Sequence, residues 1–131
     1  MGNRLYLNLD IKDGYYSGKV KVSDDNKVIL DGYGEIKFNN KDFYFGNFKK
    51  NKFWGEGTYV TKDGFKYYGY WKEDYIDNGM ITYKEYTYTG PFKEYLPHGL
   101  GKLLFKDGRR YVGYFNNGTI ESFGTLYSIT N

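Results

Sequence analysis

The 131-residue sequence has no cysteine, alanine or glutamine, only two prolines and a single histidine. The lack of cysteine excludes disulfides and thiolate metal sites. The lack of alanine, together with 18 glycines, disfavours helix, because Ala is the best helix former and Gly one of the worst. No apolar run is long enough to cross a bilayer, and the first ten residues lack the apolar centre of a signal peptide. We therefore expect an intracellular, cytoplasmic protein whose contact with membranes is at most peripheral.

Aromatic residues and glycine dominate what is present. The 17 tyrosines and 10 phenylalanines help to raise the aromatic share to 22%, which is too high for a disordered chain. Aromatic and β-branched residues favour strands. The net charge of +3 is spread along the chain without the basic stripe of a nucleic-acid binder, so no nucleic-acid partner is expected.

The tripeptide Tyr-x-Gly recurs five times at near-regular spacing. It begins at Tyr16, Tyr44, Tyr67, Tyr88 and Tyr111, and the tyrosines are 28, 23, 21 and 23 residues apart. A period in this range is the signature of a repeat architecture. Such a stack usually presents a surface to a partner and seldom a catalytic pocket.

The segment 44–66 is the clearest unit. Its first strand is expected around Tyr44, and the turn after it at residues 50–52. A second strand is expected over residues 55–59. Asp63-Gly64 follows it and is a strong hairpin-turn signal. Glycine in a strand is unfavourable by about 0.5–1 kcal/mol relative to Ala. We expect an aromatic ring to lie over each gap that a missing Cβ leaves, and the sheet to curl toward that face.

The predicted fold is all-β, with stacked antiparallel hairpins forming one elongated, curved and twisted single-layer sheet. Residues 1–131 form one domain, with an N-terminal capping strand in 1–15, repeats from about 16, 44, 67, 88 and 111, and a C-terminal cap in 124–131. The residues expected to build the repeats are Tyr16, Gly18, Tyr44, Gly46, Gly55, Gly57, Tyr67, Gly69, Trp71, Tyr88, Gly90, Gly99, Gly101, Tyr111 and Gly113.

The third repeat departs from the pattern. Aligned on Gly55-x-Gly57, it keeps Gly79 as the first glycine and has Ile81 in place of the second. Pro91 lies inside a predicted strand, where proline cannot donate to the ladder, so we expect a bulge, a strand end or a local break there. Pro97 is expected at a turn.

The run of Tyr-x-Gly, Gly-x-Gly and Asp-Gly followed by another Tyr-x-Gly resembles the MORN repeat (membrane occupation and recognition nexus). Residues 44–71 and 88–115 carry it most fully, and weaker copies extend it over about residues 16–127, giving about five repeats. The resemblance implies stacked hairpins in an elongated, groove-bearing sheet. It also implies a scaffold or protein-interaction role, binding to anionic phospholipids in some members, and self-association.

No constellation of residues points to catalysis. His98 is the only histidine and has no cysteine or second histidine to act with, so we interpret it as a hairpin-turn residue. The Gly-x-Gly pairs do not open helices, which excludes a dinucleotide site. No nucleophile elbow or metal-spaced cluster is present. We predict no catalytic, cofactor-binding or metal-binding residue, and no enzyme activity.

The remaining candidates for function are aromatic and apolar residues on the face opposite the repeat rings. Phe45, Tyr68, Tyr70, Val112 and Tyr114 are predicted to bind a partner protein there, because an exposed apolar row usually marks a contact surface. The groove face is expected to give specificity through pockets between its rings, and the open sheet edges could add a strand from a partner or from a second copy, giving a homodimer. Two alternatives stay open: binding to anionic phospholipid at a membrane surface, and inhibition of one target enzyme.

Overall fold

The computed structural model describes residues 2–129, and their side chains except those of Ser122 and Phe123. Met1 and residues 130 and 131, which belong to the expected terminal caps, lie outside the described residues. Within residues 2–129 the chain forms twelve β-strands and no helix, which confirms the all-β class. The strands are β1 (Gly2–Ile11), β2 (Gly14–Val22), β3 (Val28–Phe38), β4 (Phe43–Lys49), β5 (Lys52–Val60), β6 (Lys66–Lys72), β7 (Tyr75–Tyr83), β8 (Tyr86–Lys93), β9 (Leu96–Pro97), β10 (Gly99–Phe105), β11 (Arg110–Asn116) and β12 (Thr119–Tyr127).

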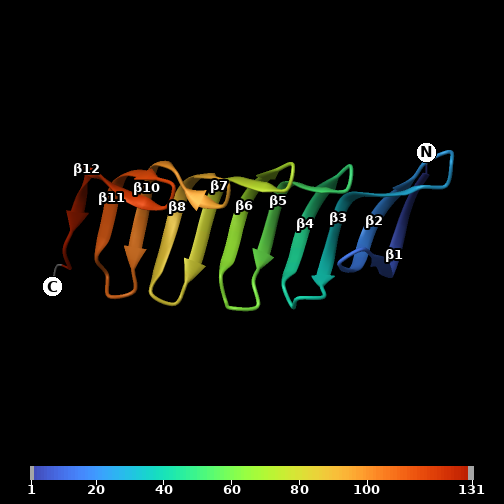
Figure 1. Cartoon of the computed structure of the whole chain (residues 1–131), viewed down its shortest axis with the longest axis horizontal. Helices are drawn as coiled ribbons and strands as arrows, with labels where there is room; N and C mark the ends of the chain where they lie inside the picture. The colour runs from blue at the N-terminus through green and yellow to red at the C-terminus, as the bar shows by residue number, and fades with distance from the viewer. Residues whose placement is uncertain (1, 130–131) are drawn as a thin grey trace.

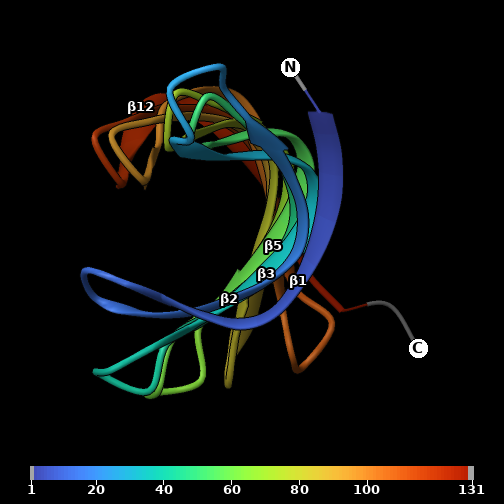
Figure 2. The ribbon, with the colours of Figure 1, turned by 90° about the vertical axis from the view of Figure 1, so that its right-hand side faces the viewer.

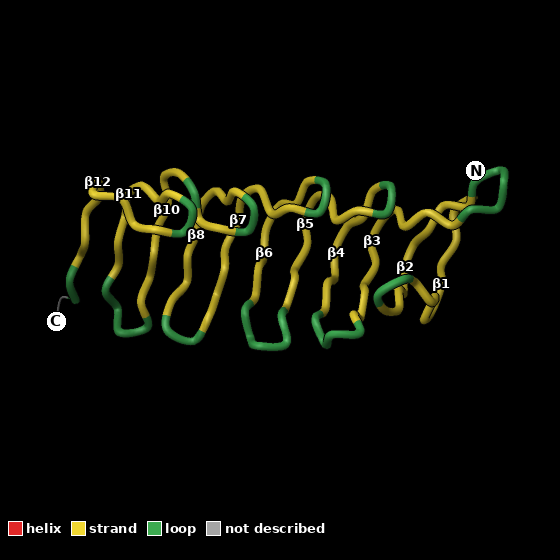
Figure 3. The backbone as a smooth tube through the Cα atoms, in the orientation of Figure 1, coloured by secondary structure: helices red, strands yellow, loops and turns green. Residues whose placement is uncertain are grey.

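The strands form one open antiparallel sheet in which neighbours in sequence are neighbours in space (Figure 1). The order runs from β1 to β8 and continues with β10, β11 and β12, while the short β9 pairs with the end of β8. The turns alternate between the two long sides of the sheet (Figure 3). The predicted stack of hairpins in a single layer is therefore confirmed.

Ten glycines form a continuous row across the sheet, one from each strand of β2 to β8 and β10 to β12. Eight cross-strand pairs of the ladder join them, and between β8 and β10 a Cβ on Gly90 would lie 3.0 Å from the Cα of Gly101. The row consists of Gly18, Gly34, Gly46, Gly57, Gly69, Gly79, Gly90, Gly101, Gly113 and Gly124. Because one face of the sheet has no Cβ atoms along this line, the strands can bend sharply toward it.

Tyrosine rings fill the space above the glycines. A Cβ on Gly57 would lie 2.1 Å from the Tyr44 hydroxyl oxygen, and one on Gly34 would lie 2.2 Å from that of Tyr16. The Tyr44 hydroxyl donates to the carbonyl of Asn47 at 3.0 Å. The same bond to the residue three positions on occurs from Tyr16, Tyr88 and Tyr111. Each of these tyrosines therefore covers glycine and satisfies a backbone carbonyl beside it.

Seen along the row of strands, the sheet is bent into a trough (Figure 2). We call the face with the glycine row and the rings the inner face, and the opposite face the outer face. The buried side chains of the inner face form one cluster along the trough. Within it, the rings of Tyr44 and Phe53 are stacked with centroids 3.8 Å apart, and the Trp71 indole donates to the carbonyl of Gly57 at 2.9 Å.

Two turn residues on one long side, Asn51 and Asp74, bond to the preceding hairpin. Asn51 donates its backbone N–H to the Leu30 carbonyl at 3.0 Å, and its side-chain Oδ1 accepts from the Leu30 N–H at 2.7 Å. Asp74 makes the same pair of bonds to Phe53, at 3.1 and 2.9 Å. Both residues have positive φ, which Asn and Asp tolerate better than most residues. These reciprocal bonds add to the ladder in joining each of the two turns to the preceding hairpin.

The third repeat requires a correction of the sequence alignment. Gly79 pairs with Gly69 and Gly90 in the glycine row, so it corresponds to Gly57 and not to Gly55. Ile81 pairs with Tyr67 and Tyr88 in the row of rings. The expectation that Ile81 replaces a glycine was wrong, because the bulge between β6 and β7 contains fewer residues than that between β4 and β5.

Around Pro91 the ladder is interrupted, as its missing N–H predicts. The β8–β10 ladder ends at Thr89 and Lys102, and pairing resumes between Phe92 and Pro97 of β9. Pro97 itself lies in β9 and not at a turn, since the tight turn comes earlier, at Glu94 and Tyr95, which both have positive φ.

Candidate functional site

The inner face holds three connected hollows that together form a groove along the trough. Their volumes are about 360, 520 and 470 Å³ from the N-terminal to the C-terminal end. The first and second share Asp13, Ile36, Phe38 and Asn51, and the second and third share Tyr67 and Tyr95. The shared walls make the hollows successive parts of one concave surface, the shape that favours ligand binding.

The C-terminal hollow is apolar. Aromatic and aliphatic side chains from β6 to β12 form its floor, and Leu96 and Ile120 form part of its lip. These two lip side chains are 45% and 47% exposed. No charged residue lines this hollow; its lining is Phe65, Tyr67, Ile81, Tyr86, Tyr88, Tyr95, Leu96, Pro97, Leu103, Phe105, Phe115, Gly118 and Ile120. Its surface suits apolar side chains of a partner.

The middle hollow combines aromatic rings with carboxylates. Asp13 and Asp74 line it, and Asp42 lies next to it, where it accepts a hydrogen bond from the Tyr59 hydroxyl at 2.6 Å. Burial raises the pKa of Tyr95 to about 12, and the nearby Asp74 charge adds to this shift. The Tyr95 hydroxyl is therefore neutral at physiological pH, and the charge of the middle hollow comes from the carboxylates of Asp13 and Asp74.

Tyr67 stands where the middle and C-terminal hollows meet. Although it belongs to a Tyr-x-Gly tripeptide, the three atoms nearest to a Cβ on Gly69, or on Gly79 of the next strand, are all backbone atoms. The ring is half-buried, and its centroid lies 5.9 Å from that of Tyr95. The Tyr67 ring therefore lines the groove and does not cover a glycine.

The other residues expected to build the repeat lie on the inner face. Tyr16, Tyr44, Tyr88, Tyr111 and Trp71 are buried. Gly18, Gly46, Gly57, Gly69, Gly90, Gly101 and Gly113 belong to the glycine row. Gly55 and Gly99 lie outside it, opposite Trp71 and Phe115 on the neighbouring strand.

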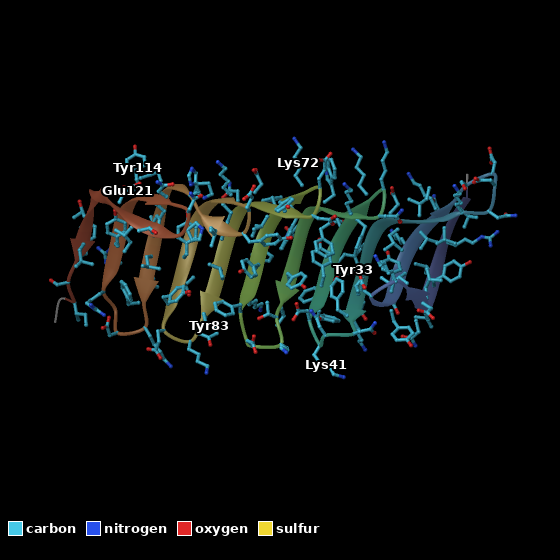
Figure 4. All side chains as sticks on the ribbon, in the orientation of Figure 1. Tyr33, Lys41, Lys72, Tyr83, Tyr114 and Glu121 are labelled. Carbon is cyan, nitrogen blue, oxygen red and sulfur yellow. The ribbon has the colours of Figure 1, made fainter. Side chains whose placement is uncertain are left out.

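The five residues expected to bind a partner alternate with these and lie on the outer face. Tyr68, Tyr70 and Tyr114 are 43%, 61% and 52% exposed, and Tyr114 projects away from the ribbon (Figure 4). Phe45 and Val112 are half-buried. They form two groups and not one row: Phe45, Tyr68 and Tyr70 lie over β4 and β6, and the other two lie on β11.

Sequence reasoning missed residues on both faces. On the outer face, Leu100 pairs with Tyr114 and Tyr33 pairs with Asn47; both are the middle residue of Gly-x-Gly, so their position carried a signal. In the groove, Tyr95 belongs to the tight turn after β8 and Leu96 directly follows it, and at a turn the alternation between faces gives no guide. His98 is not a turn residue: it lies between β9 and β10, and its Nδ1 accepts from the Asn117 N–H at 3.2 Å.

The part of the chain that the structure describes holds no group of three or more His, Cys, Asp or Glu side chains arranged to hold a metal ion. No helix within residues 2–129 has the length and apolarity needed to cross a membrane. The groove presents apolar surface, tyrosine hydroxyls and carboxylates, a combination of groups that is suited to binding a ligand.

Comparison with known proteins agrees with this geometry. The MORN repeat family matches residues 44–65, 88–109 and 111–130, which include most of the two stretches that carry the pattern most fully. Over 64 residues, 49% of the chain, the sequence is 38% identical to the "Inactive protein tyrosine kinase pTKL" of Plasmodium berghei (strain Anka), and the match covers 5% of that protein. MORN repeats are generally modules that interact with proteins or membranes. The chain is therefore a MORN-repeat protein.

Proposed function

We propose that this chain is a non-enzymatic protein-binding module, located in the cytoplasm, that holds a segment of a partner protein in the groove of its inner face. The observation that carries the proposal is the continuity of the three hollows, which share walls from Leu9 to Ile120. A continuous concave surface that is apolar at one end and carries polar groups toward the other is suited to receive a chain segment.

Binding through the outer face is a second proposal, because three of its tyrosines are largely exposed. Tyrosines are favoured anchors at interfaces. The two groups on this face are separated by β7, β8 and β10, so a partner would need to cover about 20 Å of sheet to meet both. The groove concentrates more apolar surface in one place.

Anionic phospholipid receives less support as a ligand of the groove. The two larger hollows contain two carboxylates and no lysine or arginine, whereas anionic lipids are held by clustered basic residues. An inhibitor of an enzyme would be a special case of protein binding, and no residue favours that case over others.

The test compares two variants as baits in affinity capture from the native host, followed by direct binding measurements on the captured protein. Leu96→Asp/Ile120→Asp places charge on the lip of the C-terminal hollow at exposed positions, where folding should tolerate it. Tyr68→Ala/Tyr70→Ala/Tyr114→Ala removes the outer tyrosines. We expect the first variant to lose the partner and the second to retain it, with unchanged β-sheet circular dichroism in both.

The opposite result would move the binding site to the outer face. Retention by both variants would reject both faces and direct attention to the sheet edges.

A further inference from the structure

Charge is unequally distributed between the groove and the rest of the molecule. The chain carries a net charge of +3, yet the middle and C-terminal hollows are lined by Asp13 and Asp74 and by no basic residue. The N-terminal hollow adds Asp10 and one cation, Lys12. The two lysines labelled in Figure 4 lie instead at the two long sides of the sheet, Lys72 at one and Lys41 at the other. A positively charged protein therefore has a groove that is apolar at one end and acidic toward the other.

The carboxylates are available to a ligand. Among the described residues, neither Asp13 nor Asp74 forms an ion pair within 4.0 Å, while acidic residues elsewhere, such as Asp31 and Asp107, pair with Lys21 and Arg109. Asp74 uses Oδ1 to accept from the Phe53 N–H. Bonding to a backbone amide leaves its negative charge in place.

The groove also favours a particular backbone conformation in its occupant. The backbone groups of the sheet are paired in the ladder, so an extended segment lying on the inner face could not join it. In the apolar hollow, such a segment would bury N–H and C=O groups without partners, which is costly. A helix satisfies its own backbone groups and presents side chains only.

From these observations we propose that the groove receives an amphipathic α-helix of a partner protein with a basic end. Its apolar stripe fills the C-terminal hollow, and its lysine or arginine side chains meet Asp74 and Asp13. This inference rests on the proposed function of the groove and adds the chemistry of the partner.

The spacing of the hollows sets the spacing within the helix. The middle hollow is built around β5 and the C-terminal hollow around β8 and β10, three to four strands away, which corresponds to about 15–20 Å at the usual strand separation. A helix rises about 1.5 Å per residue. The basic residues should therefore lie about 10–13 residues from the centre of the apolar stripe.

Two synthetic helical peptides of about 20 residues test the proposal on the full 131-residue chain. Both carry the same leucine stripe; one has lysines and the other glutamates at one end. Isothermal titration calorimetry should show at least tenfold tighter binding of the lysine peptide, and this preference should shrink in high salt. Leu96→Asp/Ile120→Asp should weaken both peptides.

The decisive variant is Asp13→Asn/Asp74→Asn. Asparagine at position 74 can keep the bond to the Phe53 N–H, because Asn51 already makes that bond to Leu30 in the preceding hairpin. We expect threefold to tenfold weaker binding of the lysine peptide, the range for partly exposed ion pairs. Asp63→Asn/Glu85→Gln makes the same change in net charge at exposed turn positions that line none of the three hollows, and should leave binding unchanged.

The outcomes separate the two claims. Equal binding of both peptides, unaffected by Asp13→Asn/Asp74→Asn but lost in Leu96→Asp/Ile120→Asp, would overturn the charge preference and leave the groove as a binding site. The helix proposal would be overturned if neither peptide bound, or if binding were unchanged in Leu96→Asp/Ile120→Asp. In those cases the affinity-capture experiment tests separately whether the groove binds the natural partner.

Discussion

Tyr44 covers Gly57 of the neighbouring strand with its ring, and its hydroxyl donates to the Asn47 carbonyl of its own strand. The sequence predicted the first relation, since rings beside glycines were expected to fill the missing Cβ positions. It did not predict the second, because the carbonyl becomes reachable only where the ladder shifts register next to Gly46. Tyrosine is thus favoured over phenylalanine at this position, because its hydroxyl donates a hydrogen bond in addition to the packing of its ring.

Substitution of Gly57 by alanine tests the close packing of ring and glycine. The added Cβ would lie 2.1 Å from the Tyr44 hydroxyl oxygen, so the buried ring must move. We expect a loss of about 1–3 kcal/mol in the free energy of unfolding, as for other overpacked sites. Urea denaturation measures it. Gly2→Ala is the matched control, because nothing lies within 4 Å of a Cβ there; equal stability of the two variants would contradict the packing argument.

Tyr67 shows where residue-level prediction fails. Its tripeptide is the same as that of Tyr44, yet its ring lines the groove and not the glycine row. The difference shows on the adjacent strand: a Cβ on Gly57 would meet the Tyr44 ring, whereas the atoms nearest to a Cβ on Gly79 belong to the backbone of Tyr68 and Gly69. A register difference of this kind depends on the bulge between two strands, which a pattern in one of them does not encode.

At the scale of elements, the hairpins were predictable and their alignment was less so. Asp-Gly and Lys-Asn turns with alternating rings predicted the stack of hairpins that the structure confirms. The third hairpin was misaligned at Gly79 because a fixed Gly-x-Gly spacing was assumed. Its pairing with Gly69 and Gly90 places it in the glycine row.

The hydrogen bond from the Leu30 N–H to the Asn51 side chain joins two successive hairpins. Asn51→Gly keeps the backbone free to adopt its φ of 70° but removes the bond from the Leu30 N–H. We expect a destabilisation of about 0.5–1.5 kcal/mol, the usual net worth of one hydrogen bond, measured by urea denaturation. Lys50→Gly, at the other positive-φ position of the same turn, removes no such bond and should be neutral or stabilising. A neutral Asn51→Gly would show that the bond does not stabilise the stack.

At the scale of the molecule, the curvature decides where the candidate site lies. The sequence predicted a curved sheet with ring pockets on its groove face, but the named binding residues were placed on the outer face, because most inner rings were expected to belong to the core. Bending makes the inner face concave, and three hollows lie along it. The pattern within a single strand does not contain their position. Tyr95 of the turn after β8 and Leu96 of β9 complete the groove, and their contribution depends on the path of that turn.

The same single-layer architecture leaves β1 paired on one side only, so β1 is an open edge of the sheet. Leu5 and Leu7 are 76% and 86% exposed, and long apolar edge strands readily pair with another chain. We expect the 131-residue chain to self-associate through β1 as its concentration rises, measured by size-exclusion chromatography with light scattering. Leu7→Lys should keep it monomeric, because a charge at the edge opposes strand pairing. Leu104→Lys makes the same change on an interior strand, β10, at a side chain that is also about half exposed, and should leave self-association intact. If both variants dissociate the dimer equally, or neither does, the contact between copies does not run through β1.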